Sequence, residues 1–170
     1  MHYRLPLSII ITTMLSLASM SSYAAGNLFL GPKVYSVSLD NPNYDNAINA
    51  GVLVGAKFTA SSTHSFALEA EMSQTMAKGD VGTQEWELNT FGIFGAFRAG
   101  GNLYFKGKLG FVDRELRTST GSINDDNELA IGLGFGFQDS TMRMLEIEYT
   151  EIDDNRYSPE IRMVSIAYYF

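Results

Sequence analysis

A chain of 170 residues suits one domain that is large enough to bury a core. It holds no cysteine, which excludes disulfides, thiolate metal sites, a cysteine nucleophile and a lipid-bearing cysteine. The formal net charge of −7 argues against nucleic acid as a partner, because backbone phosphates attract the opposite charge. The 16 glycines and 12% aromatic residues favour strands over helices.

Residues 1–24 predict a secretory signal peptide that is cleaved from the mature protein. Arg4 gives a positive start, LPLSIIITTMLSLA is apolar, and SMSSYAA is small and weakly polar. Ser22 and Ala24 supply the small residues needed at positions −3 and −1, so we expect cleavage after Ala24. The alternative is a membrane-anchoring helix, for which the apolar stretch is short.

The rest of the chain, residues 25–170, alternates in hydrophobicity with period two, which is the signature of β-strands. In ELAIGLGFGF, for example, Leu129 and Ile131 share one face, while Ala130 and Gly132 share the other. The first and fourth strands alternate poorly, so their faces are not assigned. The predicted strands are 28–38, 50–60, 66–76, 86–97, 103–115, 129–138, 143–152 and 160–170.

The connections between these strands alternate between short and long. The short ones are SSTHS, RAGGN and DST, and the third of the long ones, RTSTGSINDDNE, covers 117–128. Neighbouring strands joined in this way form an up-and-down meander. The sequence therefore predicts an all-β, eight-stranded antiparallel up-and-down barrel in a single domain, residues 25–170.

Two kinds of eight-stranded barrel show such alternation, a soluble barrel with an apolar interior and a transmembrane barrel with an apolar exterior. The face opposite the apolar one decides between them. In the 129–138 strand that face holds Ala130, Gly132, Gly134 and Gly136 instead of polar or charged side chains. Glycines leave room in a narrow lumen that facing side chains fill. The pattern favours the transmembrane barrel.

Several segments resemble the small outer-membrane β-barrel family of OmpA- and OmpX-like proteins, often labelled the porin family. These are the signal peptide, LYFKGKLGF, GLGFGF, LEIEYTEID and the terminal SIAYYF. The resemblance implies a monomer in the cell outer membrane of a Gram-negative bacterium. It also implies contact with outer-membrane lipid and lipopolysaccharide, and delivery by periplasmic chaperones to the barrel-assembly machinery.

The last strand is similar to the family's assembly signal, in which alternating apolar residues end on phenylalanine. The matching residues are Val164, Ile166, Tyr168 and Phe170. The alternative is an ordinary edge strand that ends a sheet. An even strand number places both termini on one side, here the periplasm, with short turns inward and long loops outward.

The predicted outer loops are acidic. We expect a solvated, charged rim there, and no metal site, because INDDNE lacks the spacing of a calcium loop. The alternative is a rim that gathers divalent cations and bridges lipopolysaccharide phosphates. The charged loop residues are Asp40, Asp45, Lys78, Asp80, Arg117, Asp125, Asp126, Asp153, Asp154 and Arg156.

Catalytic and cofactor sites are not predicted. The one histidine of the 25–170 domain, His64, falls in a turn expected on the periplasmic side, away from the outer leaflet where lipid A deacylases of similar size act. Neither a zinc-protease motif nor a phosphate-binding glycine pattern is present. We therefore expect a non-enzymatic protein.

Aromatic residues are expected in girdles at the two membrane interfaces. Trp86 and Tyr149 are assigned to the outer girdle. The residues assigned to the periplasmic girdle are Phe66, Phe137, Tyr168 and Phe170.

Charged residues on the inward faces of four strands predict an ion-pair network across the lumen. Buried charges are costly unless they are paired, and an interior ion-pair plug is known in OmpA-like barrels. The alternative is separate, water-solvated charges. The predicted network residues are Lys57, Glu69, Glu71, Lys106, Lys108, Glu146 and Glu148.

These features together predict an envelope-structural or surface-interaction protein with a plugged lumen. One alternative is a narrow, porin-like channel. Another is an adhesin or resistance factor that binds an unknown surface ligand through its outer loops, among them the 117–128 loop.

Overall fold

The computed structural model describes residues 28–59, 61, 63–119, 121–141, 143–153 and 160–170. The predicted signal peptide and its cleavage site lie outside these residues. No helix in the described part of the chain is long and apolar enough to span a membrane. The strands are β1 (Leu28–Leu39), β2 (Ala47–Thr59), β3 (His64–Ala77), β4 (Gly79–Val81), β5 (Gln84–Gly100), β6 (Leu103–Thr118), β7 (Gly121–Gln138), β8 (Met144–Ile152) and β9 (Ile161–Tyr169).

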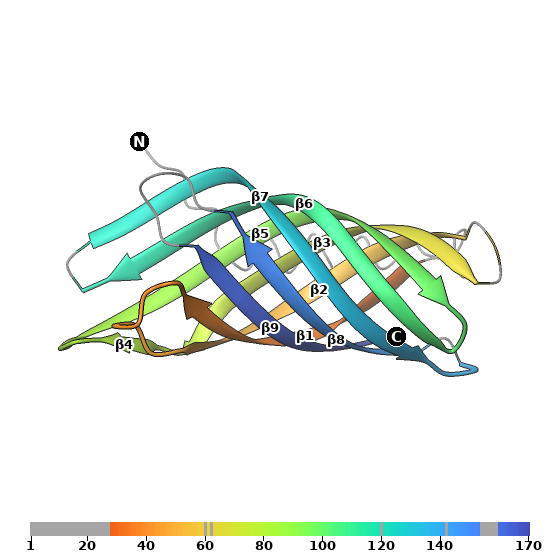
Figure 1. Cartoon of the computed structure of the whole chain (residues 1–170), viewed down its shortest axis with the longest axis horizontal. Helices are drawn as coiled ribbons and strands as arrows, with labels where there is room; N and C mark the ends of the chain where they lie inside the picture. Colours follow the sequence, from red (N-terminus) through yellow and green to blue (C-terminus); the bar gives the residue numbers. More distant parts are fainter. Residues whose placement is uncertain (1–27, 60, 62, 120, 142, 154–159) are drawn as a thin grey trace.

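The sheet closes on itself into an elongated barrel with tilted strands (Figure 1). Every pair is antiparallel, and each long strand lies beside its neighbour in the chain. The β3–β5 pair completes the meander across the short β4, and the β1–β9 pair closes the barrel, with Lys33 opposite Ala167. The predicted eight-stranded up-and-down barrel is therefore confirmed, with β4 as a small addition.

The two ends of the barrel differ. The short connections and Phe170 lie at one end, which we call the turn end, on the right of Figure 1. Strands β1, β3, β6 and β8 end at the other end of the barrel, which we call the loop end. The short β4 belongs to the loop end, where Gly82, with a φ of 62°, forms its tight turn back to β5.

The prediction of a long loop at 117–128 is wrong. Instead, β6 and β7 remain paired up to Thr118 and Gly121, so a hairpin extends the barrel at the loop end (Figure 1). The reason is that β5 offers a template there, because its pairing with β6 continues to Trp86 opposite Thr118. Polar sequence alone did not reveal this pairing.

The outer face of the barrel is apolar, as the alternation predicts. Side chains of the predicted apolar face are exposed, for example Leu109, Ile131 and Ile147, which are each at least half exposed. Exposed apolar side chains on every long strand make a continuous belt that suits lipid contact. The inner face holds the side chains that fill the lumen.

Candidate functional site: the barrel lumen

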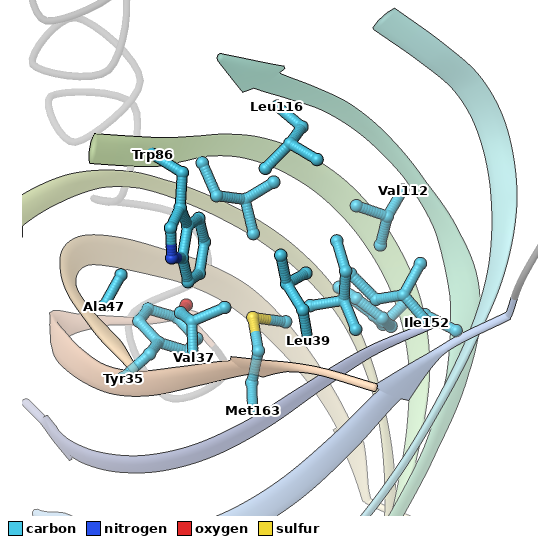
Figure 2. Packing of buried hydrophobic residues seen from close by; sticks show 13 residues of the cluster. Tyr35, Val37, Leu39, Ala47, Trp86, Val112, Leu116, Ile152 and Met163 are labelled. Carbon is cyan, nitrogen blue, oxygen red and sulfur yellow. The ribbon is translucent and has the colours of Figure 1, made fainter. Parts of the chain in front are cut away.

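The lumen near the loop end is filled by an apolar cluster rather than by water-facing side chains. Figure 2 shows its side chains converging from several strands into one packed group. Such packing excludes water from the lumen near the loop end. The cluster consists of Tyr35, Val37, Leu39, Ala47, Trp86, Leu88, Phe94, Val112, Leu116, Ala130, Ile152, Ile161 and Met163.

Trp86 belongs to this cluster, so its assignment to an outer membrane girdle is wrong. Its side chain is fully buried, its ring packs edge-on against Tyr44 at 6.1 Å, and its Nε1 donates to the Asp45 carbonyl at 3.0 Å. The fourth predicted strand carries apolar residues on both faces, which hid the inward direction of Trp86. Tyr149, at 41% exposure, does lie on the outer face.

A layer of buried charges lies next to the apolar cluster, on the side of the turn end. Four cations meet four carboxylates in the lumen, and each of the eight side chains contacts at least two partners of opposite charge. We call these eight residues the charge layer. Its members are Lys33, Glu69, Glu71, Arg98, Lys106, Lys108, Glu146 and Glu148.

One half of the charge layer is built around Arg98. Its guanidinium contacts Glu69 at 2.5 Å and Glu146 at 2.8 Å. Lys106 contacts the same two carboxylates, each at 2.8 Å. The Tyr104 hydroxyl donates to Glu146 at 2.8 Å. These contacts compensate much of the cost of removing the charges from water.

The other half is built around Glu148. Lys33 and Lys108 lie 2.6 and 2.7 Å from its carboxylate, and the same two lysines reach Glu71 at 3.0 and 2.8 Å. Tyr35 donates to Glu71 at 3.2 Å. Above this half, the Lys108 ammonium lies 3.9 Å from the ring centre of Phe94, which joins the charges to the apolar cluster.

The structure brings six of the seven predicted network residues into the charge layer, but Lys57 lies apart from it. The β2–β3 register sets Lys57 opposite Ala67 and Gly55 opposite Glu69, so Lys57 is two residues nearer the turn end. Its Nζ donates to Oε1 of Gln138 at 3.2 Å. Placing Lys57 in the network was therefore a misjudgement of its height in the lumen.

Two cations of the charge layer, Lys33 and Arg98, were not predicted. They lie on β1 and β5, whose faces could not be assigned because apolar residues occur on both sides. A signal for Arg98 does exist, because Phe97 beside it continues the outward series of Phe91 and Ile93. Nearer the loop end, Arg114 and Glu128 form a further buried ion pair that was also not predicted.

The glycines of β7 leave the space that the charge layer and its neighbours occupy. A Cβ added at Gly132 would lie 2.7 Å from Lys108 Cε, and one added at Gly136 would lie 2.3 Å from Tyr104 Cζ. Both approaches are closer than van der Waals contact allows. Glycine on this inward face therefore makes room for long side chains from β6.

Below the charge layer, a second apolar cluster is followed by an open cavity at the turn end. The cavity has a volume of about 330 Å³ and is lined by polar groups that include Lys57, His64 and Arg98. The second cluster consists of Phe29, Leu53, Ala67, Ala96, Tyr104, Met144, Ala167 and Tyr169.

Comparison with known protein families supports the assignment that the barrel suggests. Residues 10–170 match the family described as the outer membrane protein beta-barrel domain. The chain belongs to this family. The resemblance found in the sequence is thereby confirmed, and the protein is a barrel of the outer membrane.

Solved structures of other outer-membrane barrels share this fold. Ail, the attachment invasion locus protein of Yersinia pestis, matches with a TM-score of 0.59 and 13% identity over 85% of this chain and 97% of its own. The N-terminal β-barrel domain of Pseudomonas aeruginosa OprF matches with a TM-score of 0.55 and 10% identity over 84% and 97% of the two chains.

The outer membrane enzyme PagL matches with a TM-score of 0.54 and 10% identity, over 84% of this chain and 98% of its own. At such low identities these likenesses show the fold alone. No curated protein matches this chain.

The charged rim of this outer membrane protein lies at the loop end. Asp40 pairs with Arg162 at 3.3 Å, and Lys78 pairs with Glu85 at 3.0 Å, both on exposed side chains. Within the described residues, no group of three or more acidic or histidine side chains is placed to hold a metal ion. The side chains of Asp125, Asp126, Asp154 and Arg156 lie outside the description.

The outward face of β9 carries the residues predicted as an assembly signal. Val164, Ile166, Tyr168 and Phe170 are all exposed, at 42–67%. Phe170 exchanges two backbone hydrogen bonds with Leu30, at 3.0 and 3.1 Å, so it takes part in the seam between β9 and β1.

Proposed function

We propose that this protein is a closed, non-enzymatic barrel with an envelope-structural or surface-interaction role. The observation that carries the proposal is the filled lumen, in which an apolar cluster and the charge layer follow one another. An ion that crosses such a lumen has to displace packed apolar side chains and separate short ion pairs. Both steps are costly, because neither layer offers the ion a replacement for its hydration shell.

Single-channel recording in planar lipid bilayers tests the closed barrel. Reconstituted protein is expected to give no steady conductance at moderate voltage. An open barrel of this family reconstituted in the same way serves as the positive control. Steady conductance steps would favour the alternative of a narrow channel and would contradict the plug.

We propose further that both termini face the periplasm and that the loop end faces the outside. Short turns on the periplasmic side and longer connections outside are the rule for outer-membrane barrels. Under this orientation the β6–β7 hairpin projects from the cell. Protease added to intact cells is then expected to cut at the loop end, and the turn end is expected to be cut only after the outer membrane is opened.

The projecting hairpin is the part of the rim best placed for surface interaction. It continues the β-sheet to the loop end beside the β4–β5 turn, so a partner could reach it without entering lipid. Replacing residues 117–122 by an Asn-Gly turn shortens the hairpin and leaves the barrel intact. Loss of binding to host cells or matrix in this variant would favour an adhesin or resistance factor, whereas a weakened envelope would favour a structural role.

Because the fold is shared with the enzyme PagL, an enzymatic function is an alternative, and we propose that this chain is not an enzyme. In the proposed orientation His64 lies on the periplasmic side, where its Nδ1 contacts the hydroxyls of Ser61 and Thr63 at 3.1 and 2.9 Å. No acidic partner of His64 is found in the described residues. Lipid A from cells that overproduce the protein is expected to be unaltered in mass.

We also propose the partners that the family resemblance implies. Periplasmic chaperones carry the chain to the barrel-assembly machinery, which reads the outward face of β9. The assembled barrel is a monomer surrounded by outer-membrane lipid and lipopolysaccharide. The exposed apolar belt supports this proposal, because such a surface is insoluble in water.

A further inference from the structure

The turn-end cavity has the size of a small-molecule site and a polar lining. Its volume of about 330 Å³ falls in the range of pockets that bind small ligands. Hydroxyl and amide groups from three connections and from β7 surround it. The lining residues on which the argument rests are Lys57, Ser61, His64, Arg98, Gln138 and Asp139.

Lys57 brings a positive charge that the lumen does not balance. The charge layer is neutral by itself, because its four cations meet four carboxylates. Among the described residues, Lys57 Nζ contacts only the neutral amide oxygen of Gln138, at 3.2 Å. A half-buried ammonium without a direct ion-pair partner is unfavourable, and an anion in the cavity would supply that partner.

Arg98 adds a second unfulfilled donor. It lines the same cavity and is 3% exposed, yet its Nη1 has no hydrogen-bond partner in the described part of the chain. Its other nitrogens bind Glu69 and Glu146. A buried guanidinium nitrogen without a partner calls for an explanation. Nη1 is enclosed in the free barrel, so a ligand oxygen reaches it only when the side chains that cover it move aside.

Asp139 is the one carboxylate of the cavity lining, and its own turn satisfies it. Its oxygens accept from the Thr141 hydroxyl at 2.7 and 2.8 Å and from the backbone amides of Thr141 and Arg143 at 2.8 and 3.0 Å. The Thr141 hydroxyl holds the pKa of Asp139 below its usual value. Asp139 therefore stays charged, and none of its hydrogen bonds in the described residues is to Lys57.

We propose that the turn-end cavity binds a small organic anion, a carboxylate or phosphate monoester that also carries hydroxyl groups. Lys57 Nζ and the Arg98 guanidinium attract the anionic group. Gln138 and the hydroxyls of Ser61 and Thr63 bind the polar remainder. In the orientation proposed above, the ligand enters from the periplasm, and the charge layer keeps it from passing through.

Nuclear magnetic resonance titration of the full barrel in detergent micelles tests this site. D-glucose 6-phosphate and D-gluconate are the probes, and D-glucose is the neutral control. Both anions are expected to shift the backbone resonances of Arg98 and Gln138 in a saturable way, whereas glucose is not. Equal shifts with glucose, or no saturable shift with either anion, would overturn the proposal.

Variants separate the site from general charge effects. Lys57→Gln is expected to weaken binding roughly tenfold or more, because it removes a charge-assisted contact. Gln138→Glu is expected to do the same by giving Lys57 a carboxylate partner within the protein. Lys78→Gln removes a lysine at the loop end and is expected to leave binding unchanged.

Unaltered binding in both Lys57→Gln and Gln138→Glu would contradict the assignment. Nanodiscs separate a free anion from a lipid headgroup. If phosphatidylglycerol nanodiscs shift the same resonances without any added probe, the cavity binds headgroups and the free-ligand proposal is wrong.

Discussion

Lys106 connects the two halves of the charge layer through Glu148. Its Nζ lies 2.9 Å from Glu148 and 2.8 Å from each of Glu69 and Glu146. Among the ion pairs of the described residues, the Lys106–Glu148 contact is the one that joins the half built around Arg98 to the half built around Glu148. The lumen charges therefore form one connected layer rather than two separate groups.

Removing Lys106 is expected to destabilise the barrel strongly. Lys106→Met removes the cation that contacts three buried carboxylates, Glu69, Glu146 and Glu148. Breaking a buried ion pair costs about 3–5 kcal/mol of folding stability. Urea-induced unfolding in phospholipid vesicles measures the change in the free energy of unfolding. Lys78→Met, which breaks an exposed pair, is the matched control and is expected to change little. Equal effects of the two variants would show that the charge layer adds no stability.

Reversing Lys108 is expected to open the lumen as well as to weaken the fold. Lys108→Glu brings a third carboxylate to Glu71 and Glu148, and repulsion then drives these side chains apart. Planar bilayer recordings of refolded protein should show conductance that the unaltered protein lacks. A Lys108→Glu barrel that shows no conductance and unfolds like the unaltered protein would argue against closure of the lumen by the charge layer.

The inward glycines of β7 are expected to be intolerant of side chains. Gly136→Ala places a Cβ 2.3 Å from Tyr104 Cζ, so Tyr104 has to leave its hydrogen bond with Glu146. Overpacking of this kind costs about 1–3 kcal/mol. Gly107→Ala is the control, because its added Cβ meets only Leu133 Cδ2 at 3.9 Å on the outer face. Comparable unfolding curves for the two variants would contradict this account.

Trp86 offers a spectroscopic test of the apolar cluster. It is the only tryptophan of the chain, so fluorescence reports on this position alone. Burial in the lumen predicts blue-shifted emission that neither acrylamide in water nor brominated lipid quenches. Strong quenching by brominated lipid would return Trp86 to the membrane girdle that the sequence suggested.

The end of β9 is expected to matter more for assembly in cells than for stability. Phe170→Ala keeps the backbone bonds to Leu30 but removes the terminal ring, so delivery by the assembly machinery is expected to fall while spontaneous folding into vesicles continues. Leu103→Ala removes a similarly exposed apolar side chain at the turn end and serves as the control. Accumulation is measured as the heat-modifiable band in outer-membrane fractions. Equal levels of both variants would contradict a signal at Phe170.

Replacing Tyr168 and Phe170 together by Asp is the stronger version of this test. It removes the signal and places charge at the lipid interface, so the chain is expected to be degraded in the periplasm. Normal insertion of this variant would show that β9 is an ordinary closing strand.

The sequence predicted the barrel and six of the lumen charges because alternation with period two is a local property of each strand. Glu146 and Glu148 could be assigned inward since Leu145, Ile147 and Tyr149 mark the outer face. The same reasoning failed for Lys33, Arg98 and Trp86, because β1 and β5 point apolar side chains toward both the lipid and the lumen. Lys57 shows a different limit, since height in a barrel depends on strand register, which no single strand reveals.

The charge layer draws its members from β1, β3, β5, β6 and β8, and this origin bears on how the barrel folds. Lys33 on β1 reaches Glu71 and Glu148, so its partners are complete only after the first and last strands have met. Until then the carboxylates remain hydrated, and a partly closed sheet gains little from them. Closure of the seam and drying of the interior thus become one late, cooperative event. We therefore expect the finished barrel to unfold slowly, and hydrogen exchange on β1 and β9 to be as slow as on the strands farthest from the seam.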